Sequence, residues 1–208
     1  MTPSRCITGF GDVYLEADWS RFFGQLRPSQ YPGAFPIAEG LTAELGFGLI
    51  VPTGKYDAID ANTQGLSLGS NTWDFAPLAA ITYVTPPVLA EGTEFSAKVY
   101  VNNYLTNPDT NYKAGALINV DFAVIEHIGR LQLGLAGVYL TQIDDDRVNG
   151  LALPPDGRRA TALSLGGIVA YDMPELGGSM KLKILTDVTA DNFVHSHGVV
   201  FSFIKKLD

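Results

Sequence analysis

The chain has a single cysteine, Cys6, and comparatively few charged residues. One cysteine can form neither a disulfide nor a multi-thiolate metal site within the chain, and we expect Cys6 to be inert. Charged residues make up 17% of the 208 residues, whereas a soluble domain usually carries about 25%. This low charge favours a protein whose outer surface does not need to be wetted.

Clusters of basic residues are also missing, because Lys and Arg never occur in runs longer than two, as in Arg158-Arg159 and Lys205-Lys206. The formal net charge of the chain is −8. Binding to nucleic acid requires a basic face opposite the phosphates. The sequence therefore argues against a nucleic-acid partner.

No apolar run approaches the roughly 20 residues that a membrane-spanning helix requires. The segment Met1–Ile7 lacks the basic and apolar regions of a secretory signal peptide. What the chain does contain is 46% hydrophobic residues, 22 glycines and 11% aromatic residues. This mixture predicts an all-β fold, and the length predicts one domain over residues 1–208.

Period-two alternation of apolar and polar residues is the dominant pattern, and it is typical of strands with two different faces. The clearest case places Ala114, Ala116, Ile118 and Val120 opposite Lys113 and Asn119. Each alternating stretch reaches the ~9–11 residues with which a tilted strand crosses a bilayer. Nine strands are predicted: Phe10–Phe23, Ile37–Val51, Trp73–Thr85, Thr93–Leu105, Tyr112–Ile125, Arg130–Gln142, Ala160–Met173, Ser179–Thr189 and Val194–Lys205.

The connections between these strands alternate in length, which is typical of outer-membrane barrels with long external loops and short periplasmic turns. Pro52–Thr72 and Ile143–Arg159 are long, while Glu126–Gly129 and Pro174–Gly178 are short. The connection Gly24–Pro36 is an exception, because it is long where a short turn is expected. We therefore predict an antiparallel up-and-down transmembrane β-barrel.

This loop pattern also fixes the direction of each strand. If the long loops are external, the ninth strand ends in the periplasm and the first begins outside the cell. A complete barrel begins in the periplasm and has an even number of strands, so an odd number of strands is expected before Phe10. We interpret the chain as nine strands of twelve, without its first strands and signal peptide.

Several short motifs, taken in order, resemble the SphA-like family of transporters associated with phenol degradation by the meta pathway. The motifs are Gly9–Val13, Pro52–Asp57, Asn71–Pro77, Lys98–Asn103, Tyr112–Gly115 and Gly137–Tyr139, followed by Gln142 and Asp145-Asp146. The resemblance implies a twelve-stranded barrel in the cell outer membrane that admits hydrophobic, often aromatic, compounds. The chain departs from the family in lacking its signal peptide and first strands, and in not ending on an aromatic residue.

The residues with inward parity are the candidates for a solute path through such a barrel. They are Asp12, Tyr14, Glu16, Asp18, Glu44, Lys98, Tyr100, Asn102, Tyr104, Asp121 and Gln132, with Lys181, Lys183 and Asp187 on the same face. The tyrosines would offer weak apolar contacts, at ~25 cal/mol per Å² of surface removed from water. Such contacts let an apolar solute pass without trapping it.

Motifs for covalent chemistry find little support. The Gly-Lys pair at Gly54-Lys55 lacks the spacing of a phosphate-binding loop. His195 and His197 share one strand face but have no fixed third ligand, and the run Asp144–Asp146 is contiguous, unlike a calcium loop. We expect no catalytic residue, cofactor or metal, and no enzyme activity.

The predicted function is passive uptake of small hydrophobic or aromatic compounds by a monomer surrounded by outer-membrane lipid. The alternative is a soluble, lipocalin-like barrel that binds an apolar ligand in its interior. It would explain the lack of a signal peptide directly. Against it, one face of several strands is almost wholly apolar, whereas a soluble barrel needs a wetted exterior.

Overall fold

A computed structural model describes residues 8–57 and 67–205 of the chain. Its main feature is one antiparallel nine-stranded sheet in the order β1-β2-β3-β4-β6-β7-β10-β11-β12. These strands are β1 (Val13–Arg27), β2 (Ile37–Val51), β3 (Asp74–Val84), β4 (Thr93–Tyr104), β6 (Leu117–Ile128), β7 (Leu131–Gln142), β10 (Thr161–Met173), β11 (Gly178–Asp191) and β12 (His197–Lys205).

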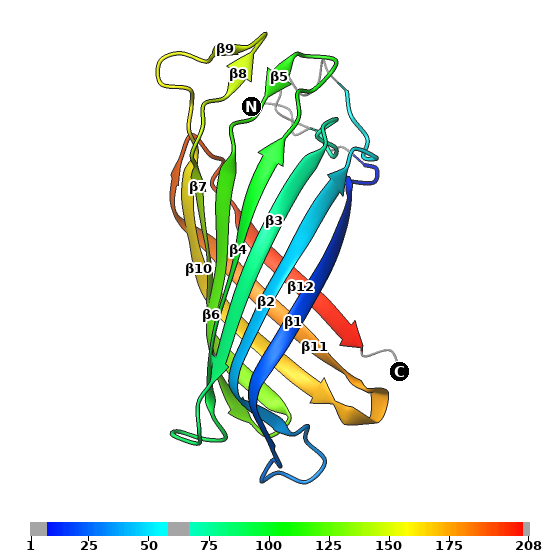
Figure 1. Ribbon diagram of the computed structural model, residues 1–208, viewed down its shortest axis with the longest axis vertical. Helices are drawn as coiled ribbons and strands as arrows, with labels where there is room; N and C mark the ends of the chain where they lie inside the picture. Colours follow the sequence, from blue (N-terminus) through cyan, green and yellow to red (C-terminus); the bar gives the residue numbers. More distant parts are fainter. Residues whose placement is uncertain (1–7, 58–66, 206–208) are drawn as a thin grey trace, which may run out of the picture.

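The sheet curls into a half-barrel, and its strands follow one another in chain order (Figure 1). β1 pairs with β2, and β12 pairs with β11, so these two strands form the edges of the described sheet. The all-β, antiparallel, up-and-down fold predicted from the alternation is confirmed.

Four connections, residues 28–36, 85–92, 129–130 and 174–177, lie at one end of the half-barrel, which we call the turn end (Figure 1). The long connections lie at the other end, together with the short connection 192–196. Residues 174–177 include a short 3-10 helix, η1 (Pro174–Leu176). The opposite, loop end carries a small three-stranded sheet of β5 (Tyr112–Lys113), β8 (Arg147–Val148) and β9 (Leu151–Ala152).

The first strand runs further than predicted, to Arg27 instead of Phe23, and pairs as far as Ile37. The ladder continues through Gly24 and Gly40, which lie opposite each other. Gly40 has φ 127°, a backbone conformation that other residues rarely adopt. The longer strand leaves only residues 28–36 between β1 and β2. The connection that departs from the alternation of long and short connections is therefore shorter than predicted.

The fifth predicted strand, Tyr112–Ile125, is divided in the structure. Tyr112 and Lys113 leave the main sheet and pair with Val148 and Arg147, while the main strand begins at Leu117. Gly115 donates its backbone N–H to Oδ1 of Asp146 at 3.0 Å instead of to a neighbouring strand. Alternation in the sequence does not reveal this competing hydrogen bond. The start of the ninth strand also differs, because β12 begins at His197 rather than at Val194.

The two faces of the sheet differ sharply in polarity. The outer, convex face exposes large apolar side chains from every strand, including Trp19 (63% exposed), Leu135 (72%) and Phe201 (65%). Few hydrophobic residues are buried, and those that pack into a core cluster are Ile125, Ala136 and Ile168. The apolar residues of the outer face therefore have no second protein layer to pack against within the described residues. In that part of the chain, no helix has the length and apolar character needed to cross a membrane.

One buried carboxylate ties three turns together at the turn end. Glu91, which is 1% exposed, accepts hydrogen bonds from the Ser29 hydroxyl at 2.6 Å, the Gln30 backbone N–H at 2.5 Å and the Gly129 backbone N–H at 3.1 Å. The Arg27 guanidinium also donates to the backbone carbonyl of Glu91. Burial alone would raise the pKa of this carboxyl, but these hydrogen bonds outweigh it and hold the pKa below the ordinary 4.5.

We expect Glu91→Gln to lower the free energy of unfolding by about 2 kcal/mol, because an amide cannot accept all three hydrogen bonds. The lowered pKa means that ionised Glu91 stabilises the fold above its ordinary pKa of 4.5. This stabilisation is lost as the pH falls through the still lower pKa of the folded state.

Urea titrations of the unaltered chain and of the Glu91→Gln variant, at pH 7 and across the acid range, measure both effects. Glu175→Gln is the matched control, because Glu175 is an exposed carboxylate at the same end, and Arg130 is its one ion-pair partner among the described residues. Equal stability of the Glu91 variant and this control would contradict the assigned role.

Candidate functional site

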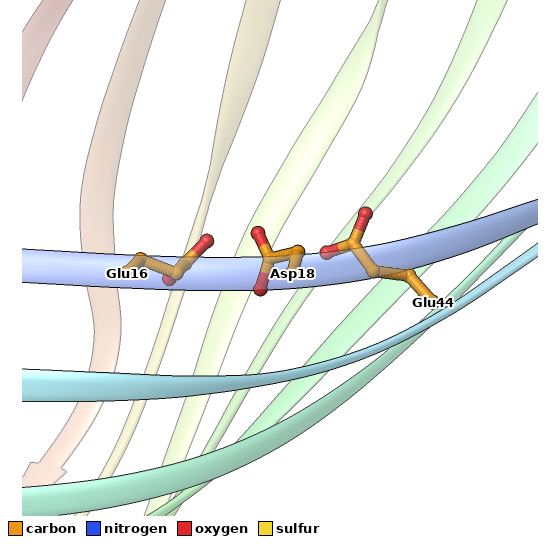
Figure 2. A group of neighbouring side chains, drawn as sticks. All are labelled: Glu16, Asp18 and Glu44. Atoms are coloured by element: carbon orange, nitrogen blue, oxygen red, sulfur yellow. The ribbon is translucent and has the colours of Figure 1, made fainter.

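A cluster of charged side chains occupies the middle of the inner, concave face. Glu16 and Asp18 come from β1 and Glu44 from β2, and their carboxylates lie in a row (Figure 2). The ammonium Nζ of Lys98, on β4, lies 2.6 Å from Glu16 Oε1, 2.8 Å from Glu44 Oε1 and 3.5 Å from Asp18 Oδ2. We call these four residues the charged belt.

The strand register explains why these side chains meet. Residues 16 and 18 share one face of β1 because successive side chains of a strand point to opposite faces. Across the ladder they face Gly48 and Gly46 of β2. A side chain at Gly46 would collide with the Asp18 carboxylate. The glycines of β2 therefore leave the room into which the acidic side chains of β1 extend.

The belt continues across the inner face with alternating charge. Lys98 is the register partner of Asp121 on β6, and Nζ of Lys183, on β11, lies 3.8 Å from Asp121 Oδ2. The oxygens of Glu16, Asp18 and Glu44 all lie within 4.8 Å of one another, a spacing that could suit a cation. The Lys98 ammonium already contacts all three carboxylates, so the protein supplies its own cation there.

Next to the belt, toward the loop end, the inner face is hollowed. This inner hollow has a volume of about 390 Å³ and is lined by five of the residues predicted for the solute path: Tyr14, Tyr100, Asn102, Tyr104 and Asp121. Lys98 connects the hollow to the belt, because its Nζ lies 5.5 Å from the centre of the Tyr100 ring. The hollow combines aromatic rings with a few polar groups, as small-molecule sites usually do.

Two of the predicted residues lie away from the belt and the hollow. Asp12 precedes β1, and its carboxylate accepts hydrogen bonds from the backbone N–H groups of Gly54 at 2.8 Å and Ser70 at 2.7 Å. Its lowered pKa reflects these bonds, which outweigh the effect of burial. Gln132 lies near the turn end and donates to the Asp172 carboxylate at 3.2 Å. Both residues hold other parts of the chain in place.

A second cavity, of about 540 Å³, lies at the loop end. Its lining includes Tyr56, Leu105, Tyr112 and Arg158. These residues are not among those predicted from the sequence for the solute path. Tyr104 lines both this loop-end cavity and the inner hollow. Tyr104 is therefore shared by a space that opens at the loops and a space on the inner face.

The loop-end cavity is built by hydrogen bonds between the long connections. Asn107 is buried and donates its side-chain N–H to the Ser70 carbonyl at 3.0 Å. The buried Asp146 accepts from the Tyr112 hydroxyl at 2.6 Å and from the Gln142 amide at 2.6 Å. The period-two pattern of the strands carries no information about such contacts. Most of the motifs on which the family resemblance rests nevertheless lie at the loop end.

Other candidates from the sequence have structural partners. In the run Asp144–Asp146, the second residue pairs with Arg159 at 2.8 Å and the third is buried, so the run is not a solvated ligand loop. His197 lies 3.2 Å from the Thr186 hydroxyl. Within the described residues, the acidic cluster of the belt is the one group with metal-ligand spacing, and it contains no histidine. Cys6 lies outside the described residues.

Comparison with known proteins finds a family model, described as "Putative MetA-pathway of phenol degradation", that matches residues 5–203. The chain belongs to this family. The match spans the whole nine-stranded sheet except the last residues of β12. No curated protein and no solved structure matches the chain. The family-level part of the resemblance seen in the sequence is thereby confirmed, and it associates the chain with the degradation of phenol.

Replacing Lys98 should expose the repulsion between the three belt carboxylates. These side chains are 21–27% exposed, so water screens part of the interaction, and we expect Lys98→Met to cost about 1–3 kcal/mol of unfolding free energy at pH 7. Adding Glu44→Gln should restore part of this loss.

Urea titration of the two single variants and the double variant measures this coupling. Lys181→Met is the matched control, because Lys181 lies on the same face and forms no ion pair with another described residue. Additive effects of Lys98→Met and Glu44→Gln would show that the belt is not an interacting unit.

Proposed function

We propose that the chain forms the wall of an outer-membrane conduit through which small hydrophobic or aromatic compounds diffuse passively. The observation that carries this proposal is the single-layer, two-faced sheet, which is apolar and exposed on its convex side and charged and tyrosine-lined on its concave side. Membership of a family associated with phenol degradation supports an aromatic solute.

Lipid is the environment that suits the outer face. Soluble monomers rarely expose contiguous apolar patches larger than a few hundred Å². Here large apolar side chains are exposed along all nine strands of the main sheet. Contact with hydrocarbon removes that surface from water, at ~25 cal/mol per Å². The strands, of 9 to 15 residues, are long enough to cross a bilayer when tilted.

Backbone hydrogen bonding adds a requirement. An unpaired sheet edge cannot face hydrocarbon, because each unsatisfied N–H or C=O there costs several kcal/mol. The edges at β1 and β12 must therefore be paired in the membrane, either with each other or with strands outside the described sheet. The conduit proposal includes this closure.

The inner face suits passage rather than capture or chemistry. The belt acids are held by Lys98, and Tyr14 donates its hydroxyl hydrogen to Glu16, so they are engaged with neighbouring protein groups. The rings of Tyr14, Tyr100 and Tyr104 offer an apolar solute a series of weak contacts. We propose that the protein acts by diffusion, without a cofactor or covalent step.

A charge placed on the outer face separates the membrane proposal from a soluble, ligand-binding barrel. Leu135, on the outer face of β7, is 72% exposed, and Leu151, in the small sheet at the loop end, is 75% exposed. In a bilayer, Leu135→Arg should cost about 2–4 kcal/mol, while Leu151→Arg should be nearly neutral. Folding into liposomes, followed by urea titration, measures both. Nearly equal effects, with a protein that stays monodisperse without detergent, would favour the soluble barrel.

Narrowing the passage should slow the solute. We expect Tyr104→Trp to reduce the protein-dependent flux of 1-naphthol severalfold, because the larger ring replaces a residue shared by the loop-end cavity and the inner hollow. Tyr139→Trp is the matched control, since Tyr139 faces outward on β7 and is 40% exposed. Uptake into liposomes with a lipopolysaccharide outer leaflet, followed by fluorescence, gives the rates. If 1-naphthol enters no faster than through protein-free membrane, the conduit proposal fails.

A further inference from the structure

The loop-end cavity contains an arginine whose charge is not neutralised by an ion pair. Arg158 lines the cavity, and it belongs to none of the ion pairs found among the described residues, whereas the adjacent Arg159 pairs with Asp145 at 2.8 Å. Two neighbouring arginines thus have different environments. One is held by a carboxylate of the protein, and the other is an exposed residue of the cavity lining.

The backbone fixes the position of this arginine. Gly157 and Arg158 both have left-handed φ angles, 78° and 51°, and a non-glycine residue with such a φ is uncommon. Gly157 is held in place, because its carbonyl accepts the Asp146 N–H at 2.9 Å and its N–H donates to the Leu153 carbonyl at 2.6 Å. A turn anchored on both sides of the peptide therefore carries the Arg158 side chain.

The cavity lining that contains Arg158 also contains the ring of Tyr112. Burial and the hydrogen bond to Asp146 raise the pKa of the Tyr112 phenol, and the positive charge of Arg158 acts in the opposite direction. An aromatic ring and the delocalised positive charge of a guanidinium therefore line the same space.

Several other polar groups of the cavity are already engaged with the protein. The Thr72 hydroxyl donates to the Leu105 carbonyl at 2.6 Å, the Ser70 hydroxyl to the Asp12 carboxylate at 2.7 Å, and the Tyr112 hydroxyl to Asp146 at 2.6 Å. Among the charged residues of the described chain, Arg158 alone lines this cavity. Recognition of a bound molecule thus falls to one cation and to a wall of tyrosine and aliphatic side chains.

We infer that the loop-end cavity binds aromatic carboxylates, with the carboxylate on the Arg158 guanidinium and the ring among Tyr56, Tyr104 and Tyr112. A guanidinium can donate two parallel hydrogen bonds to a carboxylate, and such charge-assisted bonds are roughly twice as strong as neutral ones. The volume of about 540 Å³ lies within the range usual for small-molecule sites. The inference rests on the proposed function in that it names the solute class captured at the mouth of the conduit.

The test compares benzoate with benzyl alcohol, a neutral molecule of similar size, by calorimetric titration of the full chain in detergent. We expect benzoate to bind at least tenfold more tightly. Arg158→Gln should weaken benzoate binding about tenfold and leave benzyl alcohol within twofold, because only the charged ligand loses its partner. Arg159→Gln is the matched control and should change neither affinity.

Three results would overturn the inference: equal affinity of the unaltered chain for the two ligands, unchanged benzoate binding by folded Arg158→Gln, or an equal loss in Arg159→Gln. If Arg158→Gln does not fold, salt provides a second measurement on the unaltered chain. Raising the salt concentration to about 0.5 M should weaken benzoate binding but not benzyl alcohol binding. Equal insensitivity of both ligands to salt would also overturn the inference.

This outcome is separate from the outcome for the conduit. Binding is measured in detergent micelles, where no flux occurs, and transport is measured in liposomes with 1-naphthol, which is neutral at pH 7. A preference for benzoate without 1-naphthol flux would leave the aromatic-acid site standing and remove the conduit. Flux without a preference for benzoate would do the reverse.

Discussion

The alternation of side chains along paired strands is the constraint on which the whole structure depends. Once β1 to β12 are in register, every second residue is committed to the outer face and the rest to the inner face. A slip of one residue in β4 or β1 would turn Lys98 or Glu16 outward and bring apolar residues inward. The apolar exterior, the charged belt and the inner hollow are therefore consequences of one register.

That register stabilises a sheet with very little core. Because one layer of strands has no second layer to pack against, the buried apolar cluster is limited to a few residues around Ile125 and Ala136. Stability then depends on the backbone hydrogen bonds between strands, on the environment of the outer face, and on hydrogen-bonded carboxylates at the two ends. Glu91 joins three turns at one end, and Asp12 and Asp146 join the loops at the other. Buried carboxylates that are fully hydrogen-bonded can order loops in this way.

The two cavities divide the chemistry of the inner space. The loop-end cavity combines a cation with aromatic rings, whereas the inner hollow is bordered by the charged belt and its continuation to Asp121 and Lys183. This row holds four acids and two lysines. Tyr104 lines both spaces. A solute moving from the loops to the middle of the sheet would therefore leave a positively charged environment and enter a negatively charged one. In the proposed functions, recognition and passage would therefore occur at separate places along the same strands.

The strands, their order and the face to which most side chains point can be predicted from the amino-acid sequence, because they follow from a local period of two. The candidate site cannot, because it is assembled by contacts between residues far apart in the chain. Glu16 and Lys98 are 82 residues apart, and their contact depends on the curl of the sheet. Tyr112 pairs outside the main sheet, and the Asp12 carboxylate holds a loop, because hydrogen bonds from distant loops compete with strand pairing. Arg158 lines the cavity from a left-handed turn that is held by hydrogen bonds with Asp146 and Leu153. Such long-range contacts leave no periodic trace in the chain.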